Sequence, residues 1–175
     1  MLPEAVRRFD HRIDGAFEQI RSHVPINRAF YVASELGNWS LLWHLTGVAR
    51  AVADGNRTKA AVRLSTVLAI ESVLVNQGVK RLFKRTRPVF VGERPHKLRI
   101  PVTSSFPSGH ASAAACAAVL LIDEQPELAP LFLAMTAVVS ASRIHVRIHH
   151  ASDVVGGAIV GAAIGLTARQ IWRLR

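Results

Sequence analysis

The amino-acid sequence predicts an all-α fold, an integral-membrane bundle of about five transmembrane helices that follows one N-terminal amphipathic helix. Three observations predict this fold. Half of the 175 residues are hydrophobic, and the mean hydropathy is +0.23. The apolar residues fall into five runs rich in Ala, Leu and Val with few turn residues inside them, which is typical of helices rather than strands. Several connections between these runs are basic, as in small membrane proteins.

The amphipathic helix is predicted within residues 1–28. Its apolar residues recur at three- to four-residue spacing, with Arg and Asp between them. They are Leu2, Val6, Phe9, Ile13, Phe17 and Ile20. A helix with one apolar and one basic face is expected to lie on a membrane surface. Packing on a soluble core is the alternative.

The bundle core is predicted over residues 36–168, within a single domain that spans residues 1–175. The five runs cover residues 36–53, 62–79, 108–122, 128–141 and 153–168. Several are shorter or more interrupted than the ~20 residues of an ideal membrane span, so a soluble all-α bundle is the alternative. Glu71 lies in the second run and is expected to face the bundle interior, because an ionisable group is costly in lipid.

Small residues mark two of these runs. Three glycines of the last run recur at four-residue spacing, which would allow close contact with another helix. They are Gly157, Gly161 and Gly165. Trp172, just beyond them and beside Arg169, is typical of an interfacial anchor. Cys116 lies among alanines and is predicted to be a buried, inert thiol.

The chain is strongly basic, with 22 Lys and Arg against 12 Asp and Glu. Nucleic-acid binding would explain this charge, but aromatic residues make up only 6% of the chain and no nucleic-acid motif is present. We therefore expect no nucleic-acid partner. Cations gather in residues 80–99, whereas residues 123–127 have none. The positive-inside rule then places the N-terminal segment and the 80–106 and 142–152 loops on the cytoplasmic side of a cell membrane.

Three separated blocks carry the residues of a candidate site, and the first contains Lys80, Arg87 and Pro88. Seven residues apart on a helix, the two cations would lie on nearly the same face, and Pro88 would end that helix. Two cations that face one point suit a phosphate. A solvated basic face is the alternative. The neighbouring cations, which are Arg81, Lys84 and Arg85, are expected to meet lipid headgroups or water.

The second block, Pro107-Ser108-Gly109-His110, precedes an Ala-rich run. Ser108 is well placed to cap the helix that follows, and this cap alone is the structural alternative. A helix N-terminus with free amide groups also binds anions. Gly109 would let the backbone approach a ligand closely, and His110 could donate a proton to a leaving oxygen.

The third block contains Ser142, Arg143, His149 and Asp153. His149 and Asp153 are four residues apart, so the carboxylate can accept one ring N–H and leave the other ring nitrogen as a nucleophile. The alternative is a helix start in which Ser152 is the cap and Asp153 is favoured by the helix dipole. His145 and His150 suggest a metal cluster, but no Cys is nearby and one carboxylate accompanies them, so no metal is expected.

In order and spacing, the blocks Lys80-x6-Arg87-Pro88, Pro107-Ser108-Gly109-His110 and Ser142-Arg143-x5-His149-x3-Asp153 resemble the complete signature of the type 2 phosphatidic acid phosphatase superfamily. The likeness spans about residues 75–165. That superfamily includes membrane lipid phosphatases, soluble bacterial acid phosphatases and vanadium haloperoxidases, with a helical-bundle core.

The resemblance implies phosphoryl transfer without metal or cofactor. His149 would attack phosphorus and form a phosphohistidine, and Asp153 would orient its ring. His110 would protonate the leaving oxygen and then activate water. Five further positions would hold the phosphate oxygens, namely Lys80, Arg87, Ser108, the amide of Gly109, and Arg143. Many members have a glycine at the position of Arg147 and an aromatic residue at that of His150, so these two are expected to influence substrate selectivity.

The predicted function is therefore that of a membrane lipid phosphatase. Its expected substrate is a phosphate monoester or diphosphate of a polyprenyl lipid, a polyprenyl-linked phosphosugar or a phospholipid, and a site on the cytoplasmic face favours a polyprenyl-linked precursor of envelope synthesis. Two alternatives remain. One is a soluble acid phosphatase or vanadium haloperoxidase of the same superfamily. The other is a non-enzymatic basic membrane scaffold that binds anionic headgroups or nucleic acid through residues 80–99.

Overall fold

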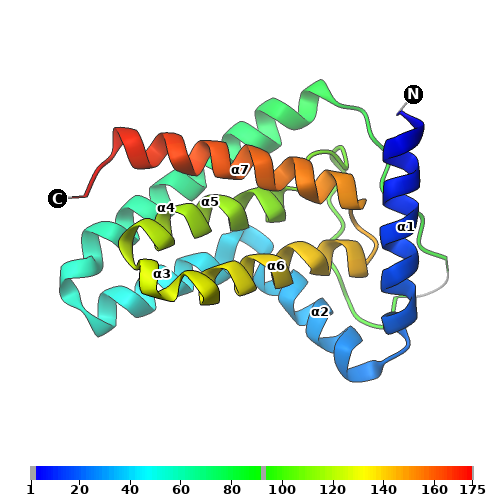
Figure 1. Cartoon of the computed structure of the whole chain (residues 1–175), viewed down its shortest axis with the longest axis horizontal. Helices are drawn as coiled ribbons and strands as arrows, with labels where there is room; N and C mark the ends of the chain where they lie inside the picture. Colours follow the sequence, from blue (N-terminus) through cyan, green and yellow to red (C-terminus); the bar gives the residue numbers. More distant parts are fainter. Residues whose placement is uncertain (1–2, 92–93, 175) are drawn as a thin grey trace.

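The computed structural model describes residues 3–91 and 94–174. Within these ranges it contains α-helices, short helical turns and no strand, which confirms the predicted all-α fold. The α-helices are α1 (Glu4–Arg21), α2 (Val24–Leu36), α3 (Leu41–Ala53), α4 (Thr58–Val73), α5 (Gly109–Glu124), α6 (Ala129–His145) and α7 (Ala151–Ile171). Helices α3 to α7 run along the long axis of the molecule, and α1 stands across one end of them (Figure 1).

Helix α5 occupies the centre of the bundle, and its alanines let the neighbouring helices approach. Gly157, Gly161 and Gly165 form a ridge on α7, and this glycine ridge packs against α5. A Cβ on Gly157 or Gly161 would overlap the carbonyl oxygen of Ser108 or Ser112, respectively. The glycine ridge is therefore an internal contact of the bundle, and only glycine fits at these two positions.

Two predictions about buried polar and sulfur groups are confirmed. Glu71 is 1% exposed, and one of its carboxylate oxygens accepts a hydrogen bond of 2.5 Å from the Ser112 hydroxyl. The bond gives the buried carboxyl group a partner inside the bundle. Cys116 is fully buried in the main hydrophobic core.

The N-terminal segment is two helices rather than the one amphipathic stretch predicted for residues 1–28. Helix α1 ends at Arg21, and α2 begins at Val24 with Pro25 in its first turn, a position where proline is favoured. Helix α2 thus spans the boundary between the predicted N-terminal segment and the predicted core, which was expected to begin at residue 36. The amphipathic pattern itself is real, because Ile13 and Phe17 pack against the bundle end. Leu2 lies outside the described residues.

The helix that carries Lys80 ends earlier than the sequence spacing suggests. Helix α4 continues through a π turn (Leu74–Gly78) and a 3-10 turn (Val79–Leu82), and Phe83 is already extended. The prediction that Lys80 and Arg87 share one helix face is therefore wrong. Like charges three or four residues apart, as at Arg81, Lys84 and Arg85, destabilise a helix, and Pro88 disfavours helical backbone before it.

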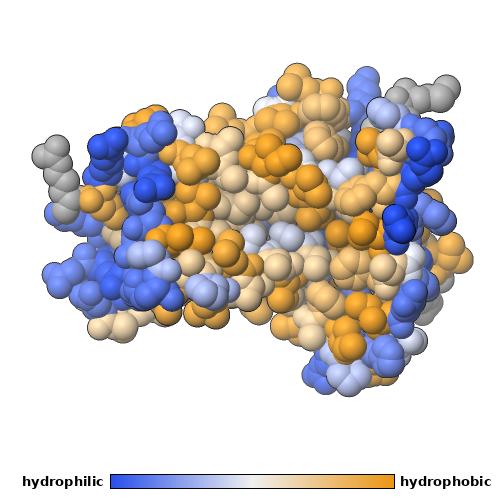
Figure 2. Space-filling model, viewed as in Figure 1, coloured by the Kyte–Doolittle hydropathy of each residue, from blue (hydrophilic) through white to orange (hydrophobic). Residues whose placement is uncertain are grey.

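Two helical segments, Pro126–His145 and Ala151–Ile171, are long and apolar enough to cross a membrane. A broad apolar band covers the middle of the molecule between two hydrophilic ends (Figure 2). Exposed side chains on these segments include Leu133, Val138, Val155 and Ile159. Both features are expected of an integral-membrane bundle.

Candidate active site

The three sequence blocks meet at the end of the bundle that α1 covers. Lys80, Gly109, His110 and His149 line one cavity of about 370 Å³. Arg87 contacts the ring of His149 directly. The structure thus brings together residues that lie far apart in the chain.

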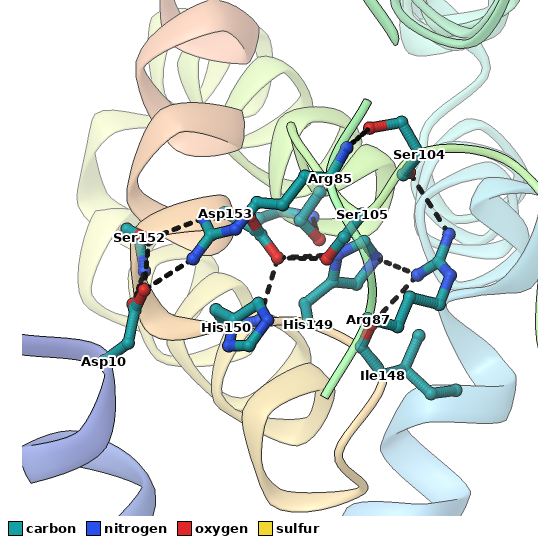
Figure 3. Close-up of polar contacts among 12 residues, drawn as sticks. Asp10, Arg85, Arg87, Ser104, Ser105, Ile148, His149, His150, Ser152 and Asp153 are labelled. Carbon is teal, nitrogen blue, oxygen red and sulfur yellow. Dashed lines mark hydrogen bonds and ion pairs between the residues drawn. The ribbon is translucent and has the colours of Figure 1, made fainter. Parts of the chain in front are cut away.

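His149 lies in the short loop between α6 and α7, with its two ring nitrogens in different surroundings. Nε2 is 3.3 Å from Nη1 of Arg87. Nδ1 is 3.6 Å from Oδ2 of Asp153 (Figure 3). Because a guanidinium has only donors, Nε2 must accept, and the ring proton belongs on Nδ1. The two atoms predicted to form a hydrogen bond, Nδ1 of His149 and Oδ2 of Asp153, thus face each other at a distance slightly longer than that of a hydrogen bond.

The ring of His149 is neutral at ordinary pH. Burial lowers its pKa to about 3, and the charges of Arg143 and Arg87 act in the same direction, whereas Asp153 opposes them. Only the neutral ring has a lone pair on Nε2. The environment of His149 therefore maintains the form that a nucleophile requires.

Asp153 is fully buried in the first turn of α7. Its Oδ2 accepts from the backbone N–H of His150 at 2.8 Å and from the Ser105 hydroxyl. Its Oδ1 accepts from Nη1 of Arg85 at 2.5 Å. The alternative prediction that Ser152 caps this helix is wrong, because His150 occupies the cap position and Asp153 binds its N–H.

Arg87 is held in the extended segment by backbone carbonyl groups. Its guanidinium donates to Pro101 at 3.0 Å, to Ile148 at 2.9 Å and to Thr103 at 3.1 Å. These bonds hold the guanidinium of Arg87 beside His149, although the segment that carries Arg87 is not helical. Burial lowers the pKa of Arg87 from its ordinary value.

Lys80 and Arg143 complete the positive surroundings of the cavity. Lys80 is 6% exposed. Burial lowers its pKa to about 8, with Arg87 and Arg143 acting in the same direction. Arg143 is fully buried in α6, and one of its nitrogens donates to the hydroxyl of Ser34 on α2.

Two further donors of Arg143, Nε and Nη2, have no hydrogen-bond partner among the described residues. A buried donor without a partner costs about 1–3 kcal/mol. Anionic oxygens would satisfy such donors and would complement the three converging cations.

The second block forms the start of α5, as predicted. The Ser108 hydroxyl accepts from the N–H of Ala111 at 3.5 Å and caps the helix. A Cβ on Gly109 would lie 3.6 Å from Nζ of Lys80 and 3.2 Å from Oδ1 of Asn76, so the backbone here lies next to the cation. The N-terminus of α5 and the ammonium group of Lys80 therefore both favour an anion at this place.

His110 contacts a residue that sequence reasoning missed. Its Nε2 is 3.0 Å from Oδ1 of Asn38, and since an amide oxygen only accepts, Nε2 carries a proton. Ser34 lies in the last turn of α2, and Asn38 begins the 3-10 turn that follows it (Asn38–Ser40). Only the fold brings them to the second and third blocks.

Arg85 corrects another prediction. It was expected to meet headgroups or water, but its side chain is 12% exposed and pairs with both Asp10 and Asp153. Its neighbour Arg81 is exposed as expected and donates to Gln77 one turn earlier. Within one run of like residues, no local signal distinguishes the buried arginine from the exposed one.

Arg147 and His150 line a second cavity of about 510 Å³, which His149 also borders. Arg147 has a positive φ of 51°. It pairs with Glu18 of α1 at 2.7 Å. Both side chains are thus close to the nucleophile but outside the cavity that contains Lys80 and His110.

No group of three or more His, Cys, Asp or Glu residues that could hold a metal occurs in residues 3–91 and 94–174. His145 is used in packing. Its Nε2 is 2.9 Å from Oδ1 of Asn27, and its ring stacks on Phe30 at a centroid distance of 4.4 Å.

Comparisons with known proteins show a shared fold. The chain is similar to the crystal structure of a transmembrane PAP2-type phosphatidylglycerolphosphate phosphatase from Bacillus subtilis, with a TM-score of 0.73, 24% identity, and coverage of 99% of this chain and 90% of that one. It is also similar to LpxE from Aquifex aeolicus, with a TM-score of 0.70, 23% identity, and coverage of 91% and 93%. Among curated proteins, none matches the chain.

The family follows from the sequence itself. A sequence model described as the PAP2 superfamily matches residues 60–175, well over half of the chain. This match supports a phosphatase, that is, a phosphoric ester hydrolase. The chain belongs to the PAP2 superfamily.

Proposed function

We propose that this protein is a membrane lipid phosphatase that uses His149 as its nucleophile and needs neither metal nor cofactor. The observation that carries the proposal is the ring of His149, which is neutral, has its Nε2 lone pair beside Arg87, and has Nδ1 facing Asp153. The substrate is a phosphate monoester or diphosphate of a polyprenyl lipid, a polyprenyl-linked phosphosugar or a phospholipid.

The reaction has two steps. Nε2 of His149 forms a bond to phosphorus as the bond to the leaving oxygen breaks, and Nδ1–H faces the carboxylate of Asp153 while the ring becomes positive. His110 acts here with both ring nitrogens protonated: the proton on Nε2, which Asn38 accepts in this structure, goes to the leaving oxygen and leaves a neutral ring. His110 then takes a proton from water as that water attacks the phosphohistidine and releases inorganic phosphate.

Lys80, Arg87 and Arg143, together with Ser108 and the amide of Gly109, stabilise the phosphate oxygens in both steps. Phosphoryl transfer requires mainly positioning and charge stabilisation. Loss of one well-placed donor is therefore expected to cost roughly 10²–10³ in rate.

A lipid substrate is supported by the apolar band, which reaches the end of the bundle where the site lies (Figure 2). In the membrane, a substrate tail would remain among the apolar helices while its phosphate enters the cavity. The similar protein from Bacillus subtilis is described as acting on phosphatidylglycerolphosphate, which is in keeping with a lipid phosphate here.

The same geometry supports a multi-pass topology with the site on the cytoplasmic face. The N-terminal helix and the basic loop after α4 lie at one end of the bundle and the C-terminus at the other (Figure 1). The positive-inside rule favours the cytoplasm for the end with the basic loop. A tag in the 80–106 loop should react with a membrane-impermeant reagent only after the cells are permeabilised. Labelling of the tag in intact cells would contradict this orientation.

Phosphate release by the detergent-purified protein tests the function. The panel contains polyprenyl phosphates, polyprenyl diphosphates, polyprenyl phosphosugars and phosphatidic acid, all in the presence of EDTA. His149→Ala should abolish release, whereas the control His23→Ala, at an exposed position without a side-chain cap bond, should not. No release by folded wild-type protein would contradict the proposal, as would activity that EDTA removes.

Two assays separate the alternatives. A soluble acid phosphatase or haloperoxidase would stay in the aqueous fraction without detergent, against the apolar surface of Figure 2. A basic scaffold would tolerate His149→Asn and lose headgroup binding gradually as Arg81 and Lys84 are neutralised.

A further inference from the structure

One acidic residue of the N-terminal helix is buried, unlike its neighbours. Asp10 on α1 is 8% exposed. Its Oδ1 accepts the backbone N–H of Ser152 at 2.8 Å, and its Oδ2 accepts the Ser152 hydroxyl at 2.9 Å. A carboxylate is rarely buried unless it is paired, so this position on α1 has a specific partner.

That partner is Arg85. Its Nη2 donates to Oδ2 of Asp10 at 2.6 Å. Its Nη1 donates to Oδ1 of Asp153 at 2.5 Å and to the hydroxyl of Ser152 at 2.8 Å. A single planar guanidinium thus joins α1 to the first turn of α7 (Figure 3). A lysine ammonium, which is one point charge, could not reproduce this two-sided bridge.

The bridge determines how Asp153 faces the nucleophile. Oδ1 of Asp153 is held by Arg85, and Oδ2 is held by Ser105 and the N–H of His150. With both oxygens held, the carboxylate keeps Oδ2 facing Nδ1 of His149. The two carboxylates and one guanidinium sum to one negative charge, which complements the positive charge that develops on His149 when it bonds to phosphorus.

We propose that Asp10 and Arg85 are positioning residues that hold Asp153, and through it the ring of His149, so that α1 takes part in phosphoryl transfer. This inference rests on the proposed function. It gives α1 a second role beyond that of a helix on the membrane surface. Asp10 and Arg85 act through Asp153.

Asp10→Asn is the test, because it keeps the shape of the side chain and an acceptor for Ser152 but cannot form the ion pair with Arg85. The expected result is a kcat about 10–100-fold lower, the size of effect found when the outer hydrogen-bond partner of a metal-bound histidine is removed. KM and inhibition by orthovanadate should stay within about threefold, since the phosphate-binding cations are unchanged. Single-turnover formation of phosphoenzyme should slow by the same factor as kcat.

Two further variants refine the result. Glu4→Gln is the matched control, because Glu4 is an exposed acidic residue of α1 that pairs with Arg7 three residues along the same helix. It should leave kcat unchanged. Asp10→Asn combined with Arg85→Gln should be little worse than Arg85→Gln alone, since the two residues act as one unit.

Three outcomes would overturn the inference. They are an unchanged kcat in Asp10→Asn, an equal loss in Glu4→Gln, or a loss of orthovanadate affinity or melting temperature that parallels the loss of kcat. His149→Ala is measured in the same series. If that variant keeps its activity, the proposed function is wrong; if it is inactive while Asp10→Asn is unaffected, only the inference about α1 fails.

Discussion

Lys80 gives the site a predicted alkaline limit. Its ammonium is almost fully buried beside Arg87 and Arg143, and its pKa is lowered to about 8. A depressed lysine pKa means that the charge is present at lower pH and is lost as the pH rises through about 8. The free enzyme should therefore bind phosphate less well above that pH.

The size of the effect follows from the pKa. With a value of about 8, the charged fraction of Lys80 falls from about nine tenths at pH 7 to about one tenth at pH 9, and kcat/KM should fall about tenfold. The second ionisation of a phosphate monoester, near pKa ~6, is complete before this range. A bound phosphate stabilises the ammonium, so the limit of kcat should lie at higher pH than that of kcat/KM.

The assay is phosphate release in detergent from pH 6 to 10 at constant ionic strength. Lys80→Arg should remove the alkaline fall even if its overall rate is lower, because a guanidinium stays charged throughout this range. Lys84→Arg, at an exposed position of the same basic run, is the control and should keep it. An alkaline fall with the same midpoint in Lys80→Arg would refute the reasoning, and so would a flat wild-type profile up to pH 10.

Three other predictions concern packing, selectivity and metal. Gly161→Ala should cost about 3 kcal/mol through overpacking, which corresponds to a melting temperature about 6–12 °C lower. Gly15→Ala, where nothing lies within 4 Å of the new Cβ, should not destabilise; equal melting temperatures would contradict this packing account. Arg147→Gly and His150→Phe should change the ratio of kcat/KM between lipid substrates more than the best kcat, and equal loss on every substrate would count against a selectivity role. Dialysis against EDTA should leave phosphate release unchanged, and recovery only on addition of Mg²⁺ or Zn²⁺ would show that a metal is needed.

The fold was largely predictable because its signals are local. Runs of Ala, Leu and Val indicated the five helices of the bundle, and the glycine spacing indicated a close helix contact, which the structure places between α7 and α5. The Ser108 cap needs only the residues beside it. The break between α1 and α2 had a signal in Pro25 that the amphipathic pattern concealed.

The site was predictable only as far as its motifs extend. Short spacing suggested that His149 and Asp153 face each other, and the structure places them 3.6 Å apart. The partners that hold them come from distant parts of the chain, as with Asp10 and Arg85. Such pairings depend on tertiary contacts, and nothing in a run of basic residues indicates which arginine will be buried.

Asp153 also starts a helix, because one of its oxygens faces His149 and also accepts the N–H of the residue that precedes α7. Its loss would therefore weaken the helix start as well as the nucleophile, and an inactive Asp153→Ala protein could not by itself separate the two effects. Attempts to redesign the substrate range are better directed at the walls of the cavity that contains Lys80 and His110, because none of its lining residues belongs to α7. There, a side chain can change without loosening the first turn of the last helix.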